Sequence, residues 1–177
     1  MAPGDEQLVT RAPNLAIGSS VAECCAPLSV SSPSLSGGST AAASFSLPTE
    51  AFAELVGGLA AEDAAHVGVM TVQWEINPWA TAEVERAEQP VSLSLTAGGA
   101  ELAVSNLSSP ILLSLPSDRD APSECRYFDE ELAAWTAAGL RVVRDDDGAV
   151  ECASNHLTAF VVAALSAVDA RAGDDAD

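Results

Sequence analysis

Apolar and polar residues alternate over several short stretches of the chain, which is the pattern of strands that bury one face and expose the other. Turn-forming Gly, Pro, Asn and Asp residues separate these stretches. We therefore expect strands at 43–47, 66–76, 91–96, 101–105, 111–115, 125–128, 140–143 and 149–152. Short strands at regular spacing predict an all-β fold, an antiparallel β-sandwich.

Two stretches depart from this alternation. Residues 158–165 are apolar on both faces of a strand, so we expect a central strand that is covered on both sides. Residues 49–56 have the spacing of one short helix that follows Pro48 and ends at Gly57, and we expect it to cover one end of the sheet. Residues 131–138 are expected to be helical or a long loop.

The chain is long enough for one folded domain with a core of its own. Residues 1–42 are rich in Ser, Pro, Gly and Ala without a sustained period, so a linker or a loosely attached strand is expected there. We expect the sandwich over 43–168 and an acidic tail at 169–177.

The charge of the chain excludes some classes of partner. It has 26 acidic side chains, seven arginines and no lysine, for a net charge of −19. Nucleic acids need a basic surface, so no nucleic-acid partner is expected, and anionic membrane surfaces are disfavoured too. We expect no direct membrane insertion, because no stretch reaches the roughly 20 apolar residues of a membrane span. The first 20 residues also lack the pattern of a signal peptide.

The four cysteines do not have the spacing of a metal site. Cys24, Cys25, Cys125 and Cys152 form no Cys-x-x-Cys pair and no Cys/His arrangement typical of zinc. The acidic run at 145–148 lacks the spaced ligands of a calcium loop and is interpreted as a hairpin turn. We therefore expect no metal and no cofactor. The adjacent pair Cys24 and Cys25 is interpreted as loop thiols.

The tripeptide His156-Leu157-Thr158, at the entry to the last apolar strand, carries the candidate chemistry. In an extended backbone, residues two apart project to the same face, so the imidazole of His156 can meet the hydroxyl of Thr158. A base beside a hydroxyl is the arrangement of an activated nucleophile, and the nearest electrophile is the carbonyl of Leu157. The chain can therefore be its own substrate. Taken singly, either residue could instead be structural.

A longer ordered pattern surrounds this tripeptide: Cys125-x-Tyr127-Phe128, Trp135, Gly139, Cys152 and His156-Leu157-Thr158-x-Phe160. It resembles the GPS motif of GAIN domains, most closely the polycystin type, and covers residues 125–165 in detail. The resemblance implies a sandwich like GAIN subdomain B, in which the GPS motif forms the C-terminal strands.

The resemblance also implies a reaction. It implies cleavage of the chain in cis between Leu157 and Thr158 by an N-to-O acyl shift, a single turnover rather than enzymatic turnover. His156 is the general base, Thr158 the nucleophile, and Leu157 supplies the scissile carbonyl. The fragments are expected to stay associated without a covalent bond, so the chain's own C-terminal strand becomes its partner.

One departure from the family pattern concerns the cysteines. Many members form two bridges, whereas this chain has Leu140 and Ser154 at one complete pair of cysteine positions. The resemblance therefore implies a single bridge between Cys125 and Cys152, in an oxidising setting. It also implies the extracellular side of a plasma or ciliary membrane, as part of a larger membrane-anchored protein. Residues 1–42 leave no room for the helical subdomain of full GAIN domains.

Two alternatives to self-cleavage stay open from the sequence. One is a GAIN-type module that does not cleave and acts as a structural or adhesion spacer. The other is an unrelated β-sandwich that binds a carbohydrate or a protein. Asn106-Leu107-Ser108 is a glycosylation sequence if the parent protein is secreted. The three tryptophans, Trp74, Trp79 and Trp135, are interpreted as packing residues rather than as a ligand platform.

Overall fold

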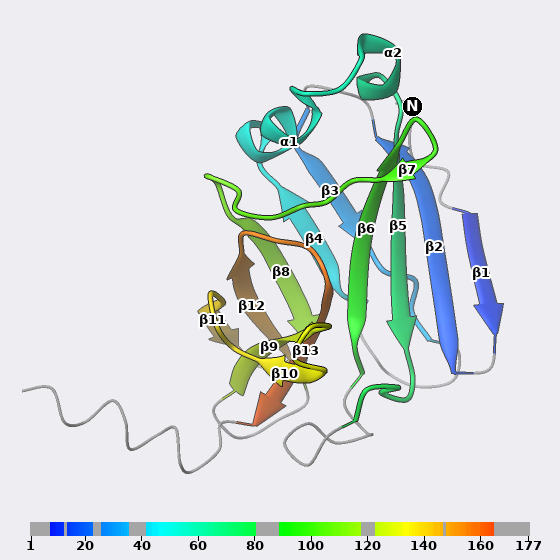
Figure 1. Cartoon of the computed structure of the whole chain (residues 1–177). Coiled ribbons are helices and arrows are strands. Elements are labelled where there is room, and N and C mark those ends of the chain that lie inside the picture. The colour runs from blue at the N-terminus through cyan, green and yellow to red at the C-terminus, as the bar shows by residue number, and fades with distance from the viewer. Residues whose placement is uncertain are drawn as a thin grey trace, which may run out of the picture.

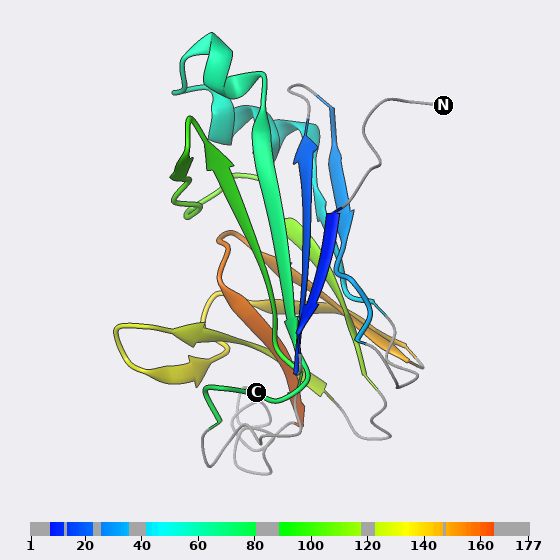
Figure 2. The same ribbon diagram turned by 90° about the vertical axis from the view of Figure 1, so that its right-hand side faces the viewer.

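The computed structural model describes residues 8–12, 14–22, 26–35, 42–80, 89–117, 123–146 and 148–164. In these ranges the chain folds into two facing antiparallel sheets, with two short helices at one end (Figures 1 and 2). The predicted all-β sandwich is therefore confirmed.

The larger sheet has the strand order β1–β2–β5–β6–β13–β9–β10, and β7 pairs with β6 beside this path. Its strands are β1 (Leu8–Ala12), β2 (Leu15–Ala22), β5 (Val67–Trp74), β6 (Val91–Ala97), β7 (Ala100–Glu101), β9 (Ser123–Asp129), β10 (Ala134–Thr136) and β13 (Ala159–Ala164). The smaller sheet has the order β11–β12–β8–β4–β3. Its strands are β3 (Leu28–Ser31), β4 (Ser44–Leu47), β8 (Ile111–Pro116), β11 (Arg141–Asp146) and β12 (Ala149–Ser154).

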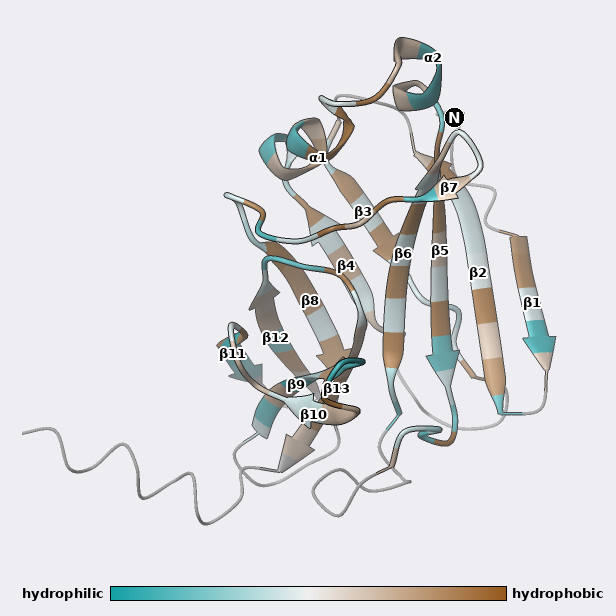
Figure 3. Cartoon of the chain, viewed as in Figure 1, coloured by the Kyte–Doolittle hydropathy of each residue, from teal (hydrophilic) through white to brown (hydrophobic). Residues whose placement is uncertain are grey.

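The main core lies between the two sheets. On β6 and β8, every second residue is buried, as the alternation of apolar and polar residues predicts (Figure 3). Leu93 and Leu95 of the larger sheet belong to the same apolar cluster as Leu113 and Leu115 of the smaller one. Alternating sequence thus becomes two apolar faces that cover each other.

The predicted short helix is α1 (Thr49–Val56), which follows Pro48 and is capped by Gly57. It adds the fully buried ring of Phe52 to the core and lies at one end of the sandwich (Figure 1). A second helical turn, α2 (Ala61–Ala64), was not predicted. None of its residues is buried, so it leaves no apolar pattern in the sequence.

Strand β13 is central and covered on both faces, as predicted. It pairs with β6 on one side and β9 on the other. Phe160 and Val162 belong to the main core, whereas Val161 and Ala163 pack in a second cluster with Trp135 on the opposite face. One strand therefore joins two apolar clusters.

Residues 1–42, expected to be a linker or a loosely attached strand, contribute strands to both sheets. This region contains β1, β2 and β3, and β2 pairs with β5 along its whole length, from Leu15 opposite Trp74 to Ala22 opposite Val67. The buried positions of β2 are small residues such as Ala16 and Gly18. Because small residues give little hydrophobic contrast, the period-two pattern is hard to detect there. The folded body therefore begins well before residue 43.

Two further segments differ from expectation. Residues 131–138, expected to be helical or a loop, contain β10, in which Trp135 lies opposite Phe128 of β9. In the segment 101–105, expected to be a strand, only Glu101 continues β7. Leu102 still donates a backbone hydrogen bond to Leu95 of β6, and beyond it Val104 and Leu107 bond to residues of the turn before β13.

Truncation of Phe160 tests the central position of β13. Phe160→Ala, in a chain that also carries Thr158→Ala so that it stays one polypeptide, should lower the free energy of unfolding by about 3–5 kcal/mol. Urea denaturation measures the change. Val143→Ala is the control, because Val143 is 48% exposed and its truncation should change stability by less than about 0.5 kcal/mol. Equal effects of the two substitutions would contradict the central packing of Phe160.

Candidate functional site

The tripeptide lies in a turn that crosses between the two sheets. Strand β12 of the smaller sheet ends at Ser154, and β13 of the larger sheet begins at Ala159. Residues 155–158 therefore form a bend rather than an extended strand. In Figure 1 this turn lies close to the loop between β7 and β8.

Two backbone hydrogen bonds hold this turn against the loop between β7 and β8. The amide of Leu157 donates to the carbonyl of Val104 at 3.1 Å, and the amide of Leu107 donates to the carbonyl of Asn155 at 3.1 Å. We call this pair of bonds the loop clasp. It holds the residue that carries the candidate scissile carbonyl.

The loop between β7 and β8 is in turn attached to α1. The hydroxyl of Ser108 donates to the Glu54 carboxylate at 2.6 Å, and the Ser108 amide donates to the same oxygen at 3.1 Å. These bonds lower the pKa of the Glu54 carboxyl, because they favour its charged form. Asn106, the candidate glycosylation residue, is exposed in this loop and has a left-handed backbone with φ of 56°. The site is thereby anchored at the helical end of the sandwich.

The imidazole of His156 packs against two aromatic rings that face each other across the β13–β9 ladder. Its ring centre is 4.4 Å from that of Tyr127 and 5.9 Å from that of Phe160. Burial lowers the pKa of His156, because the charged imidazolium loses hydration there. The neutral form, which can accept a proton, is therefore favoured near neutral pH.

The two imidazole nitrogens have different surroundings. Nδ1 lies 3.2 Å from the hydroxyl of Ser154 and 3.2 Å from Oδ1 of Asn155. Nε2 is buried and has no hydrogen-bond partner among the described residues. Ser154 was not singled out as a functional residue from the sequence, although it stands two positions before His156.

The hydroxyl of Thr158 points to a different partner from the one expected. It donates to the backbone carbonyl of Phe128 in β9 at 3.1 Å. Within the part of the chain that the structure describes, no hydrogen bond joins it to His156. The expected meeting of these side chains on one strand face is therefore not seen, because residues 155–158 bend and the neighbouring strand supplies an acceptor.

The peptide between Leu157 and Thr158 borders a groove of about 560 Å³. Trp74, Trp79 and Phe128 also line the groove. The side chain of Leu157 packs against the main core, and the side chain of Thr158 is partly exposed. The bond expected to be cut is thus held from the core side while solvent can approach from the groove.

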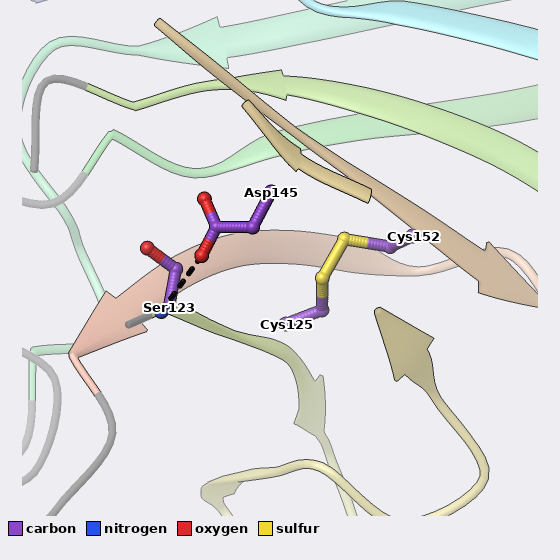
Figure 4. Close-up of a disulfide and its surroundings, with 4 residues drawn as sticks. All are labelled: Ser123, Cys125, Asp145 and Cys152. Carbon is purple, nitrogen blue, oxygen red and sulfur yellow. Dashed lines mark hydrogen bonds between the residues drawn. A yellow bond between two sulfur atoms is a disulfide. The ribbon is translucent and has the colours of Figure 1, made fainter. Parts of the chain in front are cut away.

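The structure contains the expected disulfide between Cys125 of β9 and Cys152 of β12 (Figure 4). Both cysteines are buried, and the bond joins the larger sheet to the smaller one. The amide of Ser123 also donates to the Asp145 carboxylate beside it, at 3.1 Å. Two links between the sheets therefore lie beside each other. Cys24 and Cys25 lie outside the described residues.

The three tryptophans pack against one another and against Phe128. The ring of Trp79 stacks on Phe128 at 5.3 Å and meets Trp74 edge to face at 4.9 Å. The indole of Trp135 donates to the Trp79 carbonyl at 2.8 Å.

Within the described ranges, no helix is long and apolar enough to cross a membrane, and no group of three His, Cys, Asp or Glu residues could hold a metal ion.

These features define a class of protein module: a two-sheet sandwich whose last buried strand is entered through a turn that carries His-Leu-Thr and is braced by an inter-sheet disulfide. The chain matches the family described as GPS: GAIN subdomain B over residues 27–166, and it belongs to that family.

A solved structure supports the same fold. The full extracellular region of zebrafish Gpr126/Adgrg6 superposes with a TM-score of 0.53 at 16% sequence identity, over 85% of this chain. The chain spans 23% of that much longer protein. No curated protein sequence matches the chain. In the solved structure, the part that superposes on this chain is therefore one portion of a larger extracellular region.

Removal of the disulfide tests its role as a link between the sheets. In the chain-entropy treatment, closing a loop of 27 residues stabilises the fold by about 3.5 kcal/mol. The double variant Cys125→Ala with Cys152→Ala should lose roughly this amount in urea denaturation. The exposed substitution Val143→Ala again serves as the control. A double variant as stable as the parent chain would contradict a stabilising role for the bond.

The half-buried imidazole of His156 should make stability depend on pH. The unfolded chain binds the proton near the ordinary pKa of about 6.5, whereas the folded chain binds it only at lower pH. The free energy of unfolding should therefore fall as the pH drops below about 6.5 toward the folded pKa. NMR titration of Thr158→Ala protein and denaturation at several pH values measure both effects.

The two histidines provide a matched control for this test. His156→Gln should remove this part of the pH dependence, and His66→Gln should retain it. A folded pKa of His156 at or above 6.5 would contradict the effect of burial.

Proposed function

We propose that this chain is an extracellular self-cleaving module that cuts its own peptide bond between Leu157 and Thr158. The observation that carries the proposal is the turn at residues 155–158, which crosses between the sheets and is held by the loop clasp. It combines a half-buried imidazole whose neutral form is favoured, a neighbouring hydroxyl and the carbonyl between them, beside a groove open to solvent. Membership in the GAIN subdomain B family supports the same function.

The reaction is an N-to-O acyl shift followed by hydrolysis. His156 takes the proton from the Thr158 hydroxyl, and the oxygen attacks the carbonyl carbon of Leu157. As the new C–O bond forms, the C–N bond breaks, and the proton passes to the nitrogen of Thr158. The product is an ester with a free amine. Water then hydrolyses the ester, which leaves a carboxylate on Leu157 and restores the Thr158 hydroxyl.

The attack requires a rearrangement of the turn. The hydroxyl of Thr158 must leave the carbonyl of Phe128, and the bend at residues 155–158 must bring it to the imidazole. A typical hydrogen bond contributes about 0.5–1.5 kcal/mol net, so release from Phe128 is the inexpensive part of this change. Because nucleophile and carbonyl belong to adjacent residues, no substrate has to be bound and the effective molarity is high.

Cleavage should leave the two fragments docked. The cut precedes β13, which is paired with both β6 and β9 and buried on both faces. Burial of Phe160, Val161 and Val162 contributes roughly 5–9 kcal/mol in transfer free energy. The C-terminal strand is therefore the non-covalent partner of the remainder of the chain.

The cellular setting we propose is the outer side of a plasma or ciliary membrane, within a larger polycystin-like, membrane-anchored protein. The disulfide supports an oxidising compartment. The single bridge, with Leu140 and Ser154 at the other pair of positions, supports the polycystin type. The exposure of Asn106 supports its use as a glycosylation site.

A second candidate function is a spacer of the same fold that does not cleave. The hydrogen bond from Thr158 to Phe128 favours it, because in that arrangement the nucleophile is not directed to the base. The family match removes the other alternative, an unrelated sandwich.

Denaturing electrophoresis of the purified chain distinguishes the two candidates. The parent chain should give fragments of residues 1–157 and 158–177, while Thr158→Ala should stay intact because it lacks the nucleophile. Thr158→Ser, which keeps a hydroxyl, is the matched control and should still cleave. His156→Ala should slow cleavage by about 10²- to 10⁴-fold. A parent chain that stays whole after long incubation near neutral pH would support the spacer instead.

A further inference from the structure

Ser154 is the last residue of β12, and within the described part of the chain the hydrogen bonds of its hydroxyl are all to His156. Its side chain is buried, with 1% exposure. The Ser154 hydroxyl donates to the carbonyl of His156 at 2.9 Å and accepts the His156 amide at 3.2 Å. The same oxygen lies 3.2 Å from Nδ1 of the imidazole. One hydroxyl thus contacts both the backbone and the ring of His156.

The position of the imidazole hydrogen follows from counting donors. The Ser154 hydroxyl has one hydrogen, and of its two possible acceptors on His156 the carbonyl is nearer, at 2.9 Å against 3.2 Å for Nδ1, so we assign the hydrogen to the carbonyl. Its contact with Nδ1 therefore needs a hydrogen on Nδ1. The Oδ1 atom of Asn155, also 3.2 Å from Nδ1, can only accept. Both neighbours place the hydrogen on Nδ1, and Nε2 then carries the lone pair.

The opposite tautomer is disfavoured at both nitrogens. With the hydrogen on Nε2, the lone pair of Nδ1 would face the oxygens of Ser154 and Asn155. The Nε2–H group would also be a buried donor without a partner among the described residues. A buried donor that forms no hydrogen bond is costly.

We infer that Ser154 is a positioning residue, which fixes His156 as the Nδ1–H tautomer and leaves Nε2 as the atom that receives the proton of Thr158. The effect on cleavage rests on the proposed function, whereas the tautomer is a property of the folded chain. Because Ser154 occupies one of the two positions at which many GPS motifs have a cysteine, the hydroxyl contact belongs to this chain's version of the turn.

The first experiment reads the tautomer directly. In Thr158→Ala protein, whose chain stays uncut, ¹H–¹⁵N NMR correlations of the His156 ring should show hydrogen on Nδ1 and none on Nε2. Adding Ser154→Ala should shift the ring toward a mixture of both tautomers. Ser154→Thr, which keeps a hydroxyl, should retain the Nδ1–H form.

The matched control is Ser32→Ala. Ser32 is 3% exposed, and its hydroxyl donates to Gln73 and accepts the amide of Ala43, so the variant loses a comparable buried hydroxyl outside the turn. It should leave the His156 tautomer unchanged.

The second experiment measures cleavage rate in chains that retain Thr158. Ser154→Ala should slow cleavage by at least about tenfold, since small losses of alignment are costly in intramolecular attack. Ser154→Thr should restore most of the rate, and Ser32→Ala should stay within about twofold of the parent.

The outcomes separate this inference from the proposed function. An Nε2–H tautomer in Thr158→Ala protein overturns the inference even if Ser154→Ala fails to fold, and so does a folded Ser154→Ala variant with an unchanged ring and rate. A parent chain that shows the Nδ1–H form, sensitive to Ser154→Ala, but never cleaves supports the role of Ser154 and contradicts the proposed function.

Discussion

Burial of β13 on both faces is the constraint on which the rest of the structure depends. The strand places Phe160 in the core between the sheets and Val161 in the outer aromatic cluster. Because β12 belongs to the smaller sheet and β13 to the larger one, the chain must change sheets within residues 155–158. The backbone N–H and C=O groups of this turn lie outside the strand ladders, so they need other hydrogen-bond partners. Val104 and Leu107 supply the missing partners, which fixes the turn.

The same arrangement separates the reactive bond from the contacts that hold the fold together. The bond after Leu157 lies in the crossover, whereas the ladder to β9 begins only at Phe160. Upstream of the turn, the Cys125–Cys152 bond joins the sheets directly. A cut in the crossover therefore removes one covalent connection but no strand pairing and no apolar contact of β13. The proposed cut would therefore leave the two fragments held together by β13.

Sequence alone predicts the parts of this fold in which hydrophobic contrast is strong. The sequence predicted β6 and β8 from their alternation, and it predicted β13 as a strand that is apolar on both faces. Strand β2 was not, since its buried positions are Ala and Gly, and β10 is too short for a period to appear. At the site, the identities of His156 and Thr158 were predicted, but their geometry was not. Residues two apart project to the same face only where the backbone is extended. The sheet partners of β13 determine where that strand begins, and the sequence does not show them.

The hydrogen bond from Thr158 to Phe128 bears on both candidate functions, and its size decides how much it can do. A net contribution of about 0.5–1.5 kcal/mol reduces the population of the freed hydroxyl by roughly two- to thirteenfold. A rate change of this size is small compared with the acceleration that any catalysed cleavage of a peptide bond requires. This bond alone would slow the proposed self-cleavage without abolishing it. A chain that never cleaves would therefore lack something else: contact between the Thr158 hydroxyl and His156, alignment of the Leu157 carbonyl with its nucleophile, or stabilisation of the oxyanion.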